Sequence, residues 1–160
     1  MKLRNILVSL MGITMLISAC SNNATDSEVD ILERESEYGD LPNKLNEAQT
    51  KIEVATVKKE YSTQVNELIL KIENTGTTTV GFDLPLYIEK LINGTWYQIP
   101  YKNFTFADIT LGTDSNSHYE QAVPLEHLDY QLTEGSYRII KAFYVNEGES
   151  VLGAQFDLKE

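Results

Sequence analysis

From residue 52 onward, apolar and polar residues alternate in short runs that are separated by turn-forming residues. Alternation over about four to eight residues is typical of a strand that buries one face. In one run, Leu68, Leu70 and Ile72 share a face, while the residues between them share the other. The pattern predicts strands and no long helix. The runs lie at residues 52–56, 68–73, 80–92, 95–99, 118–125, 137–145 and 151–158, with a weaker one at 104–111.

Two turn signals divide these runs further. Asn93-Gly94 lies between the runs at 87–92 and 95–99. Asn-Gly tolerates the positive φ angles of a type I′ turn, so the sequence predicts a hairpin here. Pro85 interrupts the run that starts at Val80 and has no N–H to donate to a neighbouring strand. We therefore expect an edge, a bulge or a break into two strands at Pro85.

The number and spacing of the runs indicate the fold class. About seven or eight short strands in about 110 residues favour an antiparallel β-sandwich, with a small closed barrel as the alternative. We predict an all-β domain of this kind over residues 51–160. A chain of this length buries a sufficient core without disulfides, which agrees with its single cysteine.

The first 20 residues have the pattern of an export signal. Lys2 and Arg4 precede an apolar run, residues 6–19, that is shorter than the about 20 residues of a membrane-spanning helix. The run ends in Ile17-Ser18-Ala19-Cys20, which resembles the lipobox of bacterial lipoproteins. The resemblance implies a signal peptide over residues 1–19, lipid attachment to Cys20 and anchoring at the extracytoplasmic face of the cell membrane. An ordinary secretory signal with an incidental cysteine is the alternative.

Residues 20–50 combine the candidate lipidated cysteine with a strongly acidic segment. Seven acidic residues lie between Asp26 and Asp40, against Arg34 alone. Such segments are usually disordered and extended by self-repulsion, so we predict a flexible tether that ends at residue 50. A docking segment for a basic partner, or a weak cation site, is the alternative.

Two later segments resemble a known family. Residues 132–138 resemble the tyrosine corner of immunoglobulin-like sandwiches, in which the Tyr137 hydroxyl would bond to backbone just upstream and Gly135 would suit the turn. Together with residues 88–100, which contain Glu-Lys-Leu before the turn and Gly-x-Trp after it, they look like a bacterial immunoglobulin-like domain of Gram-positive envelope lipoproteins. The resemblance implies fold and location for residues 52–159, and no activity. Lys141 falls on the same face as Tyr137, so we expect it to snorkel or a bulge to shift the register.

Charge and composition exclude some partners and sites. The chain has 13 Lys and Arg against 24 Asp and Glu, a formal net charge of -11. Nucleic-acid binding rests on cations that neutralise phosphates, so no nucleic-acid partner is expected. Electrostatic docking onto anionic lipid is disfavoured for the same reason. One cysteine also excludes an internal disulfide framework and a zinc site built on several cysteines.

The search for catalytic motifs is negative. His118 and His127 are the only histidines, and no Gly-x-Ser-x-Gly, His-Glu-x-x-His or glycine-rich phosphate loop occurs. We therefore predict no catalytic residue, no metal, no cofactor and no enzyme activity. The loop at residues 108–120 contains Asp114-Ser115-Asn116, with oxygens spaced as in a calcium loop but without its glycine. A ligand- or calcium-binding sensory lipoprotein is therefore the alternative function.

The remaining candidate is an aromatic segment at residues 96–106. Trp96 and Tyr97 face opposite ways on a regular strand, so at least one of them is expected to be exposed. Exposed aromatics beside polar groups stack on sugars or anchor a protein partner. We predict a partner-binding site at Trp96, Tyr97, Tyr101 and Lys102. The function expected from the sequence is a non-catalytic binding or structural module that meets an envelope protein or wall polymer.

Overall fold

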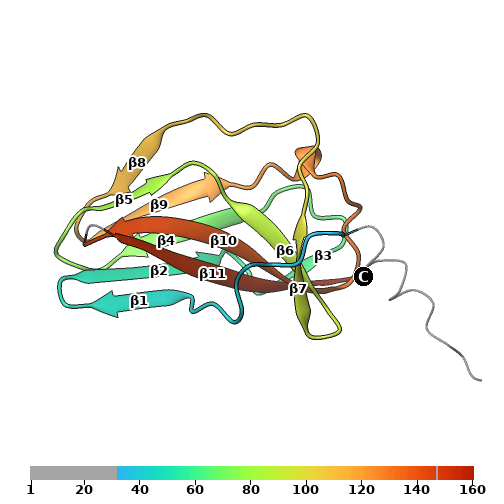
Figure 1. Cartoon of the computed structure of the whole chain (residues 1–160), viewed down its shortest axis with the longest axis horizontal. Coiled ribbons are helices and arrows are strands. Elements are labelled where there is room, and N and C mark those ends of the chain that lie inside the picture. Colours follow the sequence, from blue (N-terminus) through green and yellow to red (C-terminus); the bar gives the residue numbers. More distant parts are fainter. Residues whose placement is uncertain (1–31, 147) are drawn as a thin grey trace, which may run out of the picture.

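Two β-sheets packed face to face contain most of the residues that the computed structural model describes, 32–146 and 148–160 (Figure 1). The smaller sheet has four strands, all antiparallel. Their order across the sheet is β1 (Lys44–Glu47), β2 (Thr50–Thr56), β4 (Ile69–Asn74) and β9 (Ser117–Ala122). The helical structure among the described residues is η1, a single 3₁₀ turn at Leu125–His127.

The larger sheet has seven strands and is antiparallel except where β3 runs parallel to β11. Its main path is β3 (Glu60–Ser62), β11 (Gly148–Lys159), β10 (Gly135–Val145), β5 (Val80–Asp83) and β8 (Thr110–Thr113). A branch adds β6 (Tyr87–Ile92), which pairs with β10, and β7 (Thr95–Ile99), which pairs with β6. The predicted all-β sandwich is confirmed, with eleven strands in the described residues in place of the expected seven or eight.

Pro85 separates two strands that lie against the same edge of β10. β6 pairs with the first half of β10, while β5 meets it later, at Tyr144 opposite Gly81. The break into two strands was one of the outcomes expected at this proline. The predicted hairpin is also confirmed, because β6 and β7 are joined by Asn93 and Gly94 with φ angles of 51° and 84°.

The core lies between the sheets and is built from alternate residues of the long strands. Burial of such apolar side chains is the main favourable contribution to folding. The smaller sheet and β10 contribute the buried residues Ile52, Val54, Leu70, Ile72, Tyr137, Ile139, Phe143 and Val145. β11 contributes Leu152, Ala154, Phe156 and Leu158, which share a face as the alternation predicts.

Lys141 shares the inward face of β10 and is only 1% exposed. It neither snorkels nor follows a bulge, because β10 and β11 pair without interruption from residue 135 to 145. Its ammonium donates to Gln121 Oε1 at 2.8 Å, to the Leu84 and Pro85 carbonyls at 3.2 Å each, and to the Asp83 carbonyl. A buried charge requires such acceptors. The expectation that Lys141 snorkels or that a bulge shifts the register is therefore wrong.

The domain begins earlier than predicted. Leu32 is fully buried in the hydrophobic core, and β1 pairs with β2. The expectation of a flexible tether that ends at residue 50 is therefore wrong for residues 32–50. Their acidic side chains face solvent on a backbone that is bonded to the sheets, which local polarity does not reveal. The predicted signal peptide and Cys20 lie outside the described residues. Within the described ranges, no helix has the length and apolar character needed to cross a membrane.

Candidate functional site

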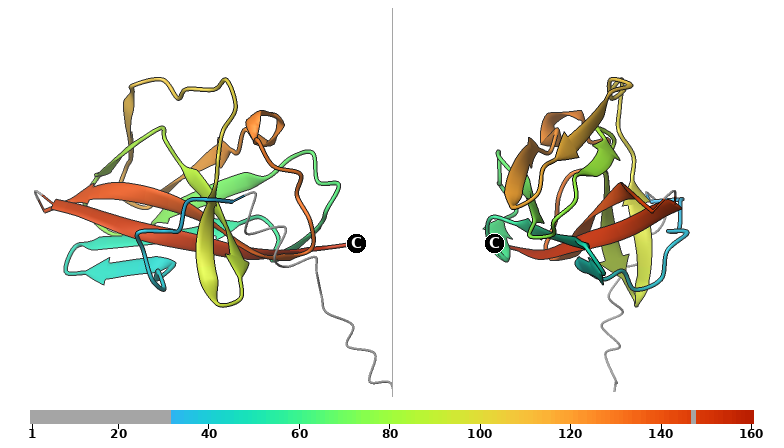
Figure 2. Two further views of the ribbon diagram at one scale, coloured as in Figure 1. Left: turned by 45° about the vertical axis from the view of Figure 1, so that its right-hand side comes forward. Right: turned by 90° about the vertical axis from the view of Figure 1, so that its left-hand side faces the viewer.

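Residues 32–43, called the strap here, run along the outer face of the larger sheet (Figure 2). The strap first extends the β7 edge: the Gln98 N–H donates to the Arg34 carbonyl, and the Ser36 N–H donates to the Trp96 carbonyl, both at 2.8 Å. It then crosses β11, where the Gly153 N–H donates to the Pro42 carbonyl at 2.9 Å. The strap is thus held at both ends by backbone hydrogen bonds.

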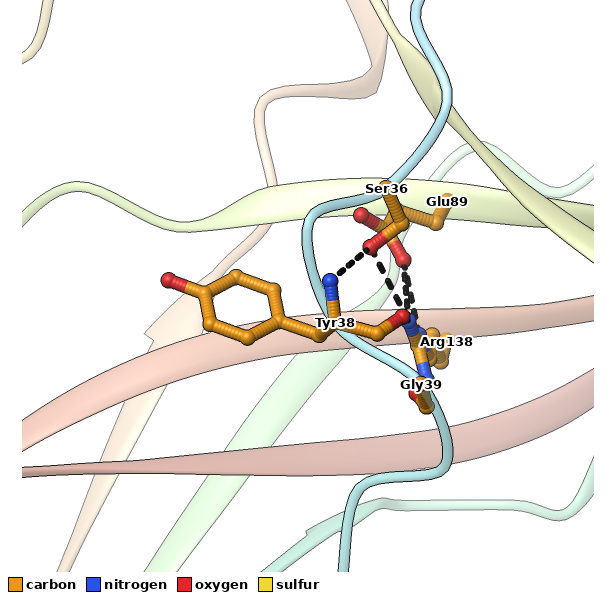
Figure 3. A network of polar contacts seen from close by, with 5 residues as sticks. All are labelled: Ser36, Tyr38, Gly39, Glu89 and Arg138. Atoms are coloured by element: carbon orange, nitrogen blue, oxygen red, sulfur yellow. Dashed lines mark hydrogen bonds and ion pairs between the residues drawn. The ribbon is translucent and has the colours of Figure 1, made fainter.

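A buried ion pair lies under the strap (Figure 3). Arg138 Nε donates to Glu89 Oε2 at 2.7 Å, and neither side chain is more than 3% exposed. The rest of the guanidinium bonds to the strap: to the Gly39 carbonyl at 2.6 Å, the Tyr38 carbonyl at 3.0 Å and Ser36 Oγ at 3.1 Å. Arg138 therefore neutralises Glu89 and fixes the middle of the strap against β10.

Trp96 forms one wall of this network. The centre of the Arg138 guanidinium lies 4.3 Å from the Trp96 ring centroid, a favourable cation–π contact. The indole is also buried, with 8% of its surface exposed. The predicted role of Trp96 as an exposed partner-binding residue is therefore wrong, because the indole is buried and Arg138 lies over its ring.

The other three residues of the predicted site do not form a shared exposed platform. Tyr97 and Tyr101 are half-buried and pack against the core. The Tyr101 ring lies 5.5 Å from Phe104, between ring centroids, and its burial raises the pKa of its hydroxyl. Lys102 is exposed and pairs with Asp129 at 3.3 Å. The aromatic segment thus serves mainly to pack the domain.

A pocket of about 210 Å³ opens on the outer face of the larger sheet, beside the strap. Three tyrosines from three elements line it, Tyr38 of the strap, Tyr87 of β6 and Tyr144 of β10, and they are 38%, 44% and 46% exposed. They are three of the five large hydrophobic side chains that the described residues leave exposed. We call this the tyrosine pocket. Its other lining residues are Asp83, Pro85, Ile140, Ala142, Glu149 and Val151.

Hydrogen bonds orient one carboxylate of the tyrosine pocket. Asp83 Oδ1 accepts from the Thr110 hydroxyl at 2.7 Å, and Asp83 Oδ2 accepts from the Tyr144 hydroxyl. These bonds, that from Tyr144 above all, hold the pKa of Asp83 below its usual range. The same bond raises the pKa of Tyr144. Asp83 is therefore ionised and Tyr144 neutral around neutral pH.

The tyrosine pocket is negative as well as aromatic. Burial, followed by the Glu149 charge, raises the pKa of Tyr38, so this tyrosine also stays neutral. Among the described residues, those that line the pocket include two carboxylates, Asp83 and Glu149, and no lysine or arginine. Neutral tyrosine rings and carboxylates both attract cations. Sequence reasoning missed this site, because its residues come from six separate elements or loops.

The tyrosine corner residue Tyr137 belongs to the core between the sheets, and not to the outer face. The Tyr137 hydroxyl donates to the Thr133 carbonyl at 2.7 Å and accepts from the Thr133 N–H at 3.2 Å. Gly135 has a φ of 142°, a conformation that favours glycine. Tyr137 itself is fully buried, so its role here is to satisfy backbone groups at the start of β10.

The two histidines and the loop at residues 108–120, the candidate calcium site, form no metal-binding cluster among the described residues. His118 is exposed on β9, whereas His127 follows β9 and stacks on Phe104 with 4.5 Å between ring centroids. In the loop, Asp114 accepts from the Thr79 hydroxyl at 3.2 Å, and Ser115 donates to the Gly76 carbonyl at 3.0 Å. Within the part of the chain that the structure describes, no group of three or more His, Cys, Asp and Glu could hold a metal ion.

Comparison with known proteins places the chain in a family. A family model described as a bacterial Ig-like domain matches residues 48–157, which is more than half of the chain. No curated protein matches it. Among solved structures, it is similar to the Pseudomonas fluorescens alkylpurine DNA glycosylase AlkC bound to DNA containing an abasic site analog. That match has 13% identity and a TM-score of 0.38 over 71% of this chain, spans only 31% of that chain, and establishes no shared function. The family match and the two-sheet sandwich agree: the chain belongs to the bacterial Ig-like domain family.

Proposed function

We propose that this protein is a lipoprotein of the cell envelope, held at the extracytoplasmic face of the membrane through Cys20, with its Ig-like domain as a non-catalytic binding module. The sequence before the domain supports the anchor: a charged start, an apolar run and a lipobox-like Ile17-Ser18-Ala19-Cys20. The described fold begins at Leu32, so residues 21–31 span the distance from anchor to domain. At about 3.4 Å per fully extended residue, these eleven residues reach at most about 40 Å, which limits how far Leu32 can lie from the anchor.

The observation that carries the binding role is the tyrosine pocket. Soluble domains bury most large aromatic side chains, and those left exposed around a concave surface are typical of binding sites. Here three tyrosines from separate elements surround one pocket that also contains Asp83 and Glu149. A strongly acidic chain of this family, with such a pocket, fits a module that recognises a partner.

The anchor is tested by labelling cells that express the full chain with a clickable fatty-acid analogue. The wild-type chain should take up the label and partition into the membrane fraction. Cys20→Ala should abolish labelling, whereas the neighbouring Ser21→Ala should not. The proposed anchor would be wrong if the wild-type chain carried no label, or if Cys20→Ala carried as much label as the wild type.

A further inference from the structure

We propose that the tyrosine pocket binds a lysine or arginine side chain of a basic protein partner. The inference rests on the proposed binding function and gives it a ligand class. The lining of the pocket matches the chemistry of a basic side chain. Three tyrosine rings can attract a cation, and two carboxylates supply the opposite charge: Tyr38, Tyr87 and Tyr144, with Asp83 and Glu149.

The carboxylate of Asp83 is already oriented for this role. Its two oxygens are held from different strands, by Thr110 of β8 and Tyr144 of β10. Each carboxylate oxygen accepts more than one hydrogen bond, so both can still accept a bond from an incoming ammonium or guanidinium. Little conformational freedom is then lost on binding, which favours affinity.

The other lining residues suit the stem of a long basic side chain. Ile140 and Ala142 of β10 and Val151 of β11 line the pocket and are apolar. Lysine and arginine carry their charge on apolar methylene stems, which pack on such residues while the charged group reaches the carboxylates. A pocket of about 210 Å³ is of the size that one such side chain fills, and is smaller than the usual sites for small molecules.

The domain uses the same chemistry within its own structure. Arg138 lies over Trp96 and pairs with Glu89, which combines an aromatic face with a carboxylate. Lys90 lies 5.6 Å from the ring centroids of both Tyr130 and Tyr137. The tyrosine pocket has the aromatic and acidic components of these contacts, and no lysine or arginine is among its described lining residues.

Charge complementarity favours a partner over this chain itself. Residues 21–31, which precede the strap, include Asp26, Glu28 and Asp30 and no lysine or arginine. Carboxylates in that segment would be repelled by Asp83 and Glu149. A second copy would bring a net charge of -11 toward the same sign of charge. A basic segment of another protein is therefore the occupant that the electrostatics favour.

The test measures binding of a short Gly/Ser peptide with three lysines to the full chain in non-ionic detergent, by isothermal titration calorimetry. Salt at about 0.15 M screens attraction to charges beyond the pocket. The peptide should bind, and the same peptide with acetylated lysines should bind at least about tenfold more weakly, because acetylation removes the charge. Tyr87→Ala and Glu149→Gln should each weaken binding about threefold to tenfold.

Matched control variants distinguish binding in the tyrosine pocket from nonspecific attraction to the acidic surface. Ile109→Ala removes another exposed apolar side chain, and Glu126→Gln removes another exposed carboxylate, both outside the pocket, and neither should change the affinity. Tyr87→Phe keeps the ring and should bind nearly as well as the wild type. Circular dichroism checks that each variant is folded.

Three results would overturn the inference: no binding of the lysine peptide, equal binding of the acetylated peptide, or equal losses in the pocket variants and their controls. Binding of tetramethylammonium without binding of the peptide would also overturn it, in favour of a quaternary ammonium ligand. The same titration with Cys20→Ala tests the pocket proposal independently of the anchor proposal. Peptide binding by that variant does not depend on the anchor, and fatty-acid labelling does not depend on the pocket.

Discussion

At the scale of single residues, Arg138 is the charged side chain whose replacement should disturb the fold most. Arg138→Met leaves Glu89 buried without its partner and removes three bonds to the strap. Loss of one member of a buried ion pair lowers the free energy of unfolding by about 3–5 kcal/mol, and urea unfolding measures this change.

Two comparisons make this prediction specific. Arg34→Met breaks the exposed pair with Glu37 and should lower the free energy of unfolding by less than about 1 kcal/mol. The double variant Arg138→Met, Glu89→Met should recover part of the loss, because no unpaired charge remains. Equal stability of Arg138→Met and Arg34→Met would contradict the role given to the buried pair.

We expect the buried Lys141 to make the free energy of unfolding depend on pH. Burial lowers its pKa to about 8, and the opposing attraction of Asp83 does not offset this. Because the unfolded chain has the higher pKa, it binds more protons than the folded chain between about pH 8 and pH 10. The free energy of unfolding of the wild type, relative to Lys141→Met, should therefore rise with pH across this window. Urea unfolding of both proteins at several pH values measures the difference, and a flat or falling difference would contradict it.

The residues of the tyrosine pocket show where prediction from sequence stops. Alternation along residues 137–145 already places Ile140, Ala142 and Tyr144 on the outward face of their strand. It cannot show that Tyr38 and Tyr87 lie beside them, because that depends on which strands are neighbours. Lys141 is a similar case, since its acceptors come from residues 83–85 and from Gln121 of the other sheet.

At the scale of elements, the strap should separate from the sheet when its hydrogen bond to β7 is removed. Ser36→Pro deletes the N–H that bonds to the Trp96 carbonyl. The neighbouring bond, from the Gln98 N–H to the Arg34 carbonyl, should then open more often. We expect faster hydrogen exchange at the Gln98 amide, with a loss of about 1 kcal/mol in the opening free energy.

Two variants serve as controls for the strap. Ser36→Ala keeps the backbone donor and removes only the side-chain hydroxyl, which accepts from Arg138 and from the Tyr38 N–H. Glu35→Pro places the proline one residue earlier, at the bridge position opposite Tyr97, where the backbone bonds of the pairing fall on residues 34 and 36. Exchange at Gln98 that is equally fast in all three variants would show that the backbone bond of Ser36 does not hold the strap.

The missed elements share a physical cause. β1 and β3 are short strands with exposed or half-exposed side chains, and the strap is acidic. These segments are held in place by backbone hydrogen bonds to neighbouring strands. Such bonds do not require apolar residues at alternate positions, so the sequence shows no hydrophobic alternation there. The long strands β10 and β11 were predictable, because each buries one face completely enough to impose a period of two.

At the scale of the whole molecule, the unit that folds should start at Leu32 and not at Lys51. A chain of residues 51–160 lacks the strap and β1, and exposes the Arg138–Glu89 pair to solvent. Loss of the buried Leu32 side chain alone corresponds to about 2–5 kcal/mol. Thermal and urea unfolding should show 51–160 to be markedly less stable than 32–160. Equal stability of the two chains would show that the strap is dispensable for folding.

The position of the strap also determines where a pulling force on the N-terminal side of the domain would act. The strap is the first described segment after the proposed anchor, so a pull between membrane and domain reaches it before any strand of either sheet. With the proposed anchor, the hydrogen bonds of Arg34 and Ser36 to β7 and the bonds of Arg138 would bear that tension. Tyr38 lies between these attachments and is one wall of the tyrosine pocket. If the chain is anchored at Cys20 and the pocket holds a partner, as proposed, tension on the anchor would act on Tyr38, and mechanical force would change how firmly that partner is held.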